Sequence, residues 1–131
     1  MWNEIRLTIS VVGTALSEWV GGFDGLLNAL VIFMLIDYVT GVFCAIAEKT
    51  LSSAIGFKGI LQKCLIMLLV GMANAVDSHI LGGDDHLLRT AVIFFYLSNE
   101  GISILENSAR LGLPIPDKLQ EFLTQIKSKG K

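Results

Sequence analysis

Charged and amide side chains stand inside long apolar stretches of this 131-residue chain. The segment YLSNEGISILEN (96–107) follows an apolar run and carries two carboxylates, Glu100 and Glu106. Two further apolar stretches also contain ionisable groups, among them Asp37 in the first and Lys63 in the second. An ionisable group within a membrane costs roughly 2.5–3.5 kcal/mol on insertion, so it indicates a functional role by default. These groups are therefore the first candidates for chemistry.

Their spacing matches no catalytic motif. The chain has no Ser/His/Asp constellation, no Gly-rich phosphate loop and no HExxH, and Asp37 lacks the companions that an intramembrane aspartyl protease needs. His79 and His86 flank a GGDD turn and offer metal ligands, but solvated loop residues are the simpler interpretation. Cys44 and Cys64 lie in apolar surroundings outside any CxxC spacing and are expected to act as small hydrophobic residues. The sequence therefore predicts no enzyme, no cofactor and no metal.

The composition favours a membrane protein. Apolar residues make up 53% of the chain and charged residues 17%, whereas soluble domains carry about 25% charged residues. A soluble chain this small needs polar surface to cover its core. The net charge of −2 gives no reason to expect nucleic acid as a partner. A soluble protein whose apolar runs form a helical core remains the alternative at this point.

Three segments are long and apolar enough to cross a bilayer, which takes about 20 mainly apolar residues. They are residues 26–47, 59–81 and 87–105. The polar turn 48–58 and the short connection GGDDH (82–86) suit neighbouring antiparallel helices. We therefore expect residues 23–112 to form a three-helix transmembrane domain in an all-α integral membrane protein.

Residues 1–22 are expected to form a helix of a different kind. Apolar residues recur at three- and four-residue steps and make one stripe: Trp2, Ile5, Ile9, Val12, Leu16 and Trp19. A helix with this pattern suits the membrane–water interface, with Trp2 and Trp19 as interface residues. A fourth crossing is the competing interpretation. The segment lacks the basic region of a signal peptide and is expected to belong to the mature protein.

Residues 113–131 are expected to form a cytoplasmic, amphipathic and basic tail. Pro114 and Pro116 break the preceding helix, and Asp117 can cap a new one. The tail has a short apolar stripe and a basic end: Leu119, Phe122, Leu123 and Ile126, then Lys127, Lys129 and Lys131.

The basic residues predict an orientation, because Lys and Arg are retained on the cytoplasmic side of a membrane. Only Arg6 and Arg89 fall on one side of the three predicted crossings. The other side, counting Lys63 near it, has Lys49, Lys58, Lys63, Arg110, Lys118, Lys127, Lys129 and Lys131. The N-terminus is therefore predicted outside and the C-terminus in the cytoplasm.

Polar and small residues within the predicted crossings fall on helix faces and are the candidate pore-lining or assembly residues. These candidates are Asp37, Gly41, Lys63, Gly71, Asn74, Asp77, Asn99, Glu100, Ser103, Glu106 and Asn107. For Asn74, Ser98 and Ser103 we favour hydrogen bonds that hold helices together in lipid, at about 0.6 kcal/mol each. For Asp37, Glu100 and Glu106 we favour assembly or the lining of an aqueous path. Because three short helices cannot enclose a lumen, such a path requires a homo-oligomer.

The depths of the charged residues suggest one pairing. Glu100 and Lys63 each lie about five or six residues from the inner end of their predicted helices, so the two can meet. Asp37 lies near mid-membrane with no base expected at its level. Since a bare carboxylate there is untenable, Asp37 is expected to be protonated, hydrogen-bonded or facing water.

Three blocks of the sequence resemble the phage-lysis and toxin-secretion holins of Gram-positive bacteria and their prophages. They are DYVTGVFCAIAEKTLSS (37–53), GFKGILQKCLIMLLVGMANAVD (56–77) and FYLSNEGISILENSARLGLPIP (95–116). The resemblance covers roughly residues 26–120, and the last block is the most specific. The residues that match the family pattern are Asp37, Gly41, Lys63, Asp77, Glu100, Ser103, Glu106 and Asn107.

The resemblance implies a small protein of the bacterial cytoplasmic membrane that oligomerises into non-selective holes. The partners that it implies are the lipid bilayer, further copies of the chain, and an endolysin or a large toxin that leaves through the hole. One alternative is a selective transport protein, such as a small oligomeric ion channel or a multidrug-carrier-like subunit. A second is a scaffold that only recruits partners through its C-terminal helix.

Overall fold

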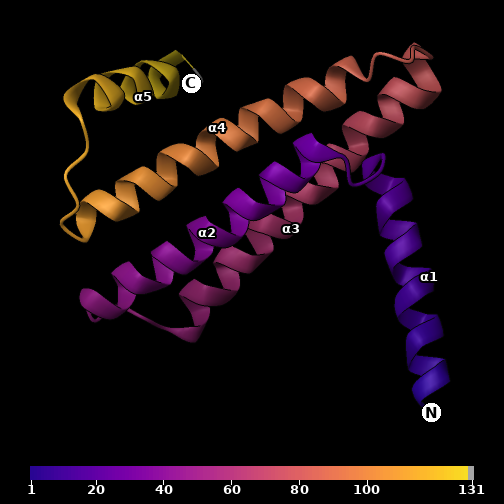
Figure 1. Cartoon of the computed structure of the whole chain (residues 1–131), viewed down its shortest axis with the longest axis horizontal. Helices are drawn as coiled ribbons and strands as arrows, with labels where there is room; N and C mark the ends of the chain where they lie inside the picture. The colour runs from indigo at the N-terminus through magenta and orange to yellow at the C-terminus, as the bar shows by residue number, and fades with distance from the viewer. Residues whose placement is uncertain (130–131) are drawn as a thin grey trace.

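The computed structural model describes residues 1–129, and within them the regular elements are all helical (Figure 1). They are α1 (Trp2–Val20), α2 (Gly25–Ala47), α3 (Ser53–Val76), the π-helical turn η1 (Asp77–Leu81), α4 (Leu87–Arg110) and α5 (Asp117–Lys129). The turn η1 continues α3 directly. The all-α class predicted from the sequence is confirmed.

Two helix boundaries differ from the predicted ones. Helix α3 begins at Ser53 rather than at residue 59, because the Ser52 side chain accepts the Ile55 N–H at 3.2 Å and caps the helix. Helix α4 continues past residue 105 to Arg110 and ends before Gly112, whose φ of +97° is left-handed. The predicted bounds came from the distribution of apolar residues. The actual start of α3 and end of α4 are instead decided by backbone capping.

Within the described residues, two helical segments are long and apolar enough to cross a membrane: α2 and the continuous segment Ser53–Leu81. In their most apolar windows only 22% and 28% of the residues are buried, whereas a helix in the core of a soluble protein is mostly buried. The low burial therefore counts against the soluble alternative. Helix α4 is not among these candidates, so two of the three predicted crossings are supported by length and composition.

Helix α4 packs against both α2 and α3, while α2 and α3 contact each other much less. Figure 1 shows these three helices running along one another. A buried apolar cluster fills the end of the bundle next to α1: Val20, Leu27, Leu30, Met34, Ile66, Val70 and Ile93. The buried Glu100 and Asn107 lie toward the other end, with Asp37 and Lys63 nearby. The apolar cluster and the polar residues around Glu100 thus lie at different levels of the three-helix bundle.

The C-terminal half of α2 and the first turns of α3 approach closely where Tyr38 meets two glycines. A Cβ on Gly59 would lie 3.3 Å from Tyr38 Cε2, and a Cβ on Gly56 would lie 3.3 Å from the Tyr38 hydroxyl. That hydroxyl also donates to the Gly56 carbonyl at 3.4 Å. The absence of side chains at these two positions lets the ring of Tyr38 lie flat on α3.

The C-terminal end of α1 docks onto α3. The Trp19 ring packs directly on Gly71, where a Cβ would lie only 1.7 Å from Trp19 Nε1. The Asn74 amide donates to the Trp19 carbonyl at 3.1 Å and to the Glu18 carbonyl at 3.4 Å. The Glu18 carbonyl also accepts the Gly21 N–H at 3.3 Å. Since the last carbonyls of a helix have no partner inside the helix, Asn74 supplies the Trp19 carbonyl with a hydrogen bond from α3.

Arg89 of α4 holds the linker between α1 and α2. Its buried guanidinium, in a residue only 3% exposed, donates to the Val20 carbonyl at 2.6 Å and to the Gly22 carbonyl at 2.8 Å. It also pairs with Asp24 at 2.9 Å. The hydrogen bond from Arg89, together with that from the Leu27 N–H, lowers the pKa of Asp24 below its usual value.

Asp77 anchors the start of α4 from the end of α3. Its carboxylate accepts the Leu88 N–H at 3.1 Å and the Arg89 N–H at 2.8 Å. These are among the N–H groups that a helix start leaves unpaired. Asp77 therefore caps α4 across the connection, and this explains its burial without a basic side chain beside it.

The rest of α1 leaves the bundle at a steep angle (Figure 1). Its apolar stripe from Trp2 to Trp19 is exposed. The hydroxyls of Thr8, Ser10 and Thr14 donate to carbonyls four residues earlier at 2.8–2.9 Å, so these polar groups are satisfied within the helix. That α1 lies at the membrane–water interface stays a prediction, with a fourth crossing as the alternative.

Helix α5 begins after the two prolines, but Asp117 is its first residue and not its cap. The cap position is that of Pro116, whose carbonyl accepts the Gln120 N–H at 3.1 Å. Phe122 of α5 lines an apolar cavity of about 600 Å³ together with Phe33 and Ile36 of α2 and Phe94 and Ile102 of α4. Some side chains of the predicted tail stripe and basic end lie outside the described part of the structure: Leu123, Ile126, Lys127, Lys129 and Lys131.

Replacing Gly71→Leu is expected to displace Trp19 and to release α1 from α3. The new side chain would occupy the volume of the indole, and overpacking of this kind typically costs about 1–3 kcal/mol. Collisional quenching of Trp19 fluorescence in vesicles, in a Trp2→Phe chain, measures the release. Gly13→Leu is the matched control, because nothing lies within 4 Å of a Cβ at Gly13. Equal quenching in both variants would contradict the docking.

Candidate functional site

Lys63 lies between two carboxylates that come from two other helices. Its Nζ is 2.5 Å from Asp37 Oδ2 of α2 and 2.5 Å from Glu100 Oε2 of α4. The side chains of Glu100, Asp37 and Lys63 are 7%, 12% and 21% exposed, so the three charges are largely enclosed. We call these three residues the ion triad. Each of the three packed helices contributes one member, through charge-assisted hydrogen bonds.

The members of the ion triad lie at the same level because their helices place them alike. Asp37 is ten residues before the end of α2, Lys63 is ten residues after the start of α3, and Glu100 is ten residues before the end of α4. These three helix ends lie together, since Arg110 pairs with Glu48 there. At about 1.5 Å per residue, each charge lies about 15 Å from that end of the bundle.

The predicted pairing of Lys63 with Glu100 is thus present in the structure, but the expectation that Asp37 has no base at its level is wrong. The error came from the predicted start of the second helix at residue 59. Because α3 actually starts at Ser53, Lys63 lies deeper in the bundle than the sequence indicated. It reaches Asp37 as well as Glu100.

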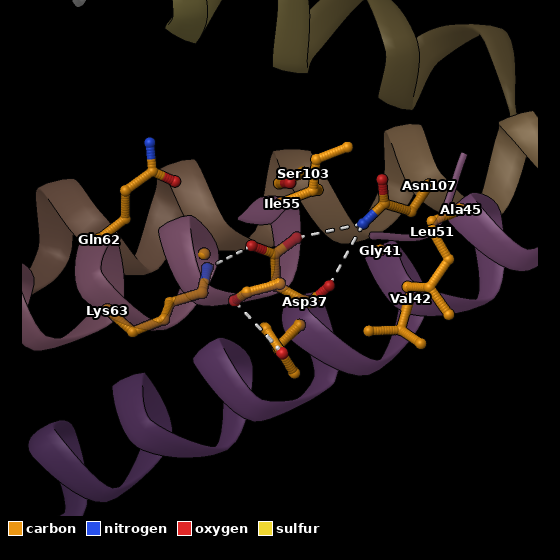
Figure 2. Close-up of a pocket in the computed structure, with 13 residues that line it drawn as sticks. Asp37, Gly41, Val42, Ala45, Leu51, Ile55, Gln62, Lys63, Ser103 and Asn107 are labelled. Atoms are coloured by element: carbon orange, nitrogen blue, oxygen red, sulfur yellow. Dashed lines mark hydrogen bonds and ion pairs between the residues drawn. The ribbon is translucent and has the colours of Figure 1, made fainter. Parts of the chain in front are cut away.

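Asn107 holds the other side of the Asp37 carboxylate. Its amide nitrogen donates to Asp37 Oδ1 at 3.2 Å and to Thr40 Oγ1 at 3.0 Å. The Thr40 hydroxyl in turn donates to the Asp37 carbonyl at 3.0 Å, and the Cys44 thiol donates to the Asn107 carbonyl at 3.2 Å. Figure 2 shows Lys63 and Asn107 on opposite sides of Asp37. Both carboxylate oxygens of Asp37 are therefore hydrogen-bonded.

A cavity of about 210 Å³ opens beside this network. Its polar lining includes Asp37, Gln62, Lys63, Ser103 and Asn107, and Gly41 and Ala45 leave room on the α2 side. A Cβ on Gly41 would lie 3.8 Å from the Asn107 amide. The cavity has room for a few water molecules, each of which takes about 30 Å³ in the liquid. Such water would hydrate the one negative charge that an ionised triad carries in excess.

The structure divides the predicted site residues among three places. Asp37, Gly41, Lys63, Glu100, Ser103 and Asn107 meet around the ion triad and its cavity. Gly71, Asn74 and Asp77 lie near the other end of the bundle, where they hold α1 and α4. Asn99, Glu106 and Trp2 are exposed. Lys63, Asn74 and Asp77 thus come from one continuous helical segment but belong to different places.

Sequence reasoning missed several partners of the network. Thr40 contributes a hydroxyl that donates to the Asp37 carbonyl, and Tyr38 and Gln62 line the cavity. Their only signal in the sequence is that they lie one to three residues from predicted site residues. Cys44 is buried as expected of a small hydrophobic residue, but its thiol is also a hydrogen-bond donor in the network.

Comparison with known proteins identifies the family. The model of the bacteriophage holin family matches residues 14–128. The chain is 41% identical over 127 residues to the 14.9 kDa protein in the nagH 3′ region of Clostridium perfringens, which covers 97% of this chain and 96% of the relative. It is 39% identical over 129 residues to a protein of Listeria innocua, covering 97% and 91%.

A phage protein is among the relatives. The chain is 38% identical over 103 residues to the probable holin of Bacillus phage phi105, covering 78% of this chain and 74% of the phage protein. No solved structure matches the chain. Because the family model spans most of its length, and relatives above 30% identity align along nearly all of it, the chain belongs to the bacteriophage holin family.

Proposed function

We propose that this protein is a holin that oligomerises in the bacterial cytoplasmic membrane and forms non-selective holes. An endolysin or a large toxin leaves the cell through these holes, and the protein itself catalyses no reaction. Membership of the holin family and the similarity to a phage protein named probable holin support this function. The ion triad is the single structural observation that carries the proposed hole-forming function. The triad encloses within one chain the charges that the wall of a hole would need.

We propose that α4 is a third crossing, with the N-terminus outside and the C-terminus in the cytoplasm. The ionisable residues Arg89 and Glu100 and the amide of Asn107 are all buried against other parts of the chain. The outward surface of α4 is therefore more apolar than the helix as a whole. The mean hydropathy of its sequence thus underestimates how well α4 suits a lipid environment. The eight-to-two division of basic residues supports the orientation.

Cysteine labelling tests this topology. In a Cys64→Ser chain, Asp85→Cys is expected to react with a membrane-impermeant maleimide added to intact cells, because the connection 82–86 lies outside. Lys118→Cys is expected to react only after the cells are opened. Labelling of both positions from the same side would contradict a third crossing, and the reverse pattern would contradict the orientation.

The closed ion triad is proposed to represent the state that waits before lysis. In this state Lys63 pairs with both carboxylates within one subunit, so a single chain encloses these charges away from lipid. When subunits assemble, rotation of α4 relative to α2 would turn these groups toward water. Loss of the membrane potential would bias such a change, since one charge moved across the membrane is worth about 2.3 kcal/mol per 100 mV.

Two substitutions in the ion triad are expected to shift lysis in opposite directions. Lys63→Gln leaves Asp37 and Glu100 together without a cation, and loss of one partner of a buried pair costs about 3–5 kcal/mol. Lysis should then begin earlier. Glu100→Gln leaves one cation with one carboxylate and removes the excess charge, so lysis should be delayed. The time from induction to the fall in culture density, with an endolysin present, is the measurement.

Arg110→Gln is the matched control for these variants. It removes a basic residue from an ion pair with Glu48 in which both side chains are about half exposed, and such surface pairs contribute only about 0–1 kcal/mol. Its lysis time should equal that of the unmodified protein. A shift of Lys63→Gln and Glu100→Gln in the same direction, or no shift in either, would count against the waiting state.

Release of proteins of graded size tests the hole itself. The protein is expressed alone in cells that contain a small and a large cytoplasmic reporter enzyme. A non-selective hole should release both enzymes at the same moment. Release of small ions without either enzyme would indicate a selective channel or carrier, and no leakage at all would indicate a scaffold. Either result would overturn the proposed function.

A further inference from the structure

Two amide side chains on the outside of the bundle flank the ion triad. Gln62 immediately precedes Lys63 on α3, and Asn99 immediately precedes Glu100 on α4. Both are exposed, and neither forms a hydrogen bond with any residue that the structure describes. Figure 2 shows the Gln62 side chain turned away from Asp37 while Lys63 reaches toward it.

Helix geometry puts the two amides on the same side of the α3–α4 pair. The short connection 82–86 makes these helices antiparallel neighbours, and Lys63 meets Glu100 between them on the side of α2. One step back along either helix turns the side chain by about 100°. Because the helices run in opposite directions, both turns lead to the same side of the pair. That side faces away from α2, because Gly101, about 200° around α4 from Asn99, faces Phe33 of α2.

The level of the ion triad fixes the level of the amides. Gln62 and Asn99 are one residue away from groups that lie about 15 Å from the inner end of the bundle. A hydrocarbon layer is about 30 Å thick, so in the proposed topology both amides lie near its middle. Gln62 also lines the cavity beside the ion triad, where water can reach it, whereas lipid offers Asn99 neither a donor nor an acceptor. Polar groups at this depth need a protein partner or water.

The surroundings of the amides are suited to a helix from another subunit. Leu65 and Met72 of α3 and Phe95 of α4 are 54%, 56% and 46% exposed, and by helix geometry they lie on this same side. The cavity that α5 lines with Phe122 involves a different side of α4, which carries Phe94 and Ile102. The described part of α5 therefore leaves the amides uncovered.

We propose that this α3–α4 face, with Gln62 and Asn99 at its centre, binds the same face of a second copy of the chain. An amide carries both a donor and an acceptor, so the surface is complementary to itself across a two-fold axis along the membrane normal. Gln62 and Asn99 of the two copies then meet at one depth and complete each other's hydrogen bonds. The proposal rests on the proposed function, for which it names the first contact in assembly.

Disulfide formation between copies tests the face. In a Cys64→Ser chain, Gln62→Cys should form dimers on mild oxidation in membranes, at least about tenfold faster than the native chain does through Cys64. The native Cys64 is a matched control, because it is exposed, lies at nearly the same depth and points about 200° away around α3. Equal or faster cross-linking through Cys64 would overturn the proposed face.

Removal of the amides tests their role in the contact. Gln62→Leu with Asn99→Leu keeps the helices apolar, and it should raise the dimer dissociation constant in vesicles about tenfold, as measured by energy transfer between labelled chains. Asn3→Leu, which removes an exposed amide from α1, should leave it unchanged. An unchanged dissociation constant in the double variant would show that the amides do not hold the copies together.

The outcomes separate this proposal from the proposed function. If large enzymes are released while cross-links form only through Cys64, the face is wrong and the hole-forming function stands. If Gln62→Cys cross-links rapidly but the unmodified protein releases no large enzyme, the face stands and the function is wrong.

Discussion

A charge that must stay out of water needs a partner, and this constraint explains how the helices of this protein pack. Lys63 is the one basic side chain among the described residues that meets two carboxylates, and it draws them from α2 and α4. Because the three groups lie equally far from one end of the bundle, the helices can pair them without sliding past one another. The relative heights of α2, α3 and α4 follow from that single cluster.

The same principle operates near the other end, with backbone groups in place of carboxylates. Arg89 and Asn74 donate to carbonyls that α1 and its linker leave unpaired, and Asp77 accepts the first N–H groups of α4. Between these polar regions lies an apolar cluster that needs no specific pairing. A bundle held by two polar regions can open one of them and remain joined at the other, which is what the proposed waiting and assembled states would require.

Much of the helix pattern could be predicted because it depends on local features. The bounds of α1 and α2 follow from the apolar pattern and from capping by Asp24, and the family could be recognised from blocks such as the one around Glu100. The start of α3 was predicted too late in the chain, because the prediction followed the apolar residues and did not consider the Ser52 cap. That error alone put Lys63 at the wrong depth and left Asp37 without its partner.

The sequence by itself determined that long apolar helices carry a few polar residues in fixed faces, since hydropathy and helical period are properties of the chain alone. Only the tertiary structure decided which polar residues meet. Lys63 and Asn74 share one helix, yet one joins the ion triad and the other holds α1, because different neighbours cover α3 at the two levels. Which side chains pair depends on contacts between helices, and no spacing within one helix specifies those contacts.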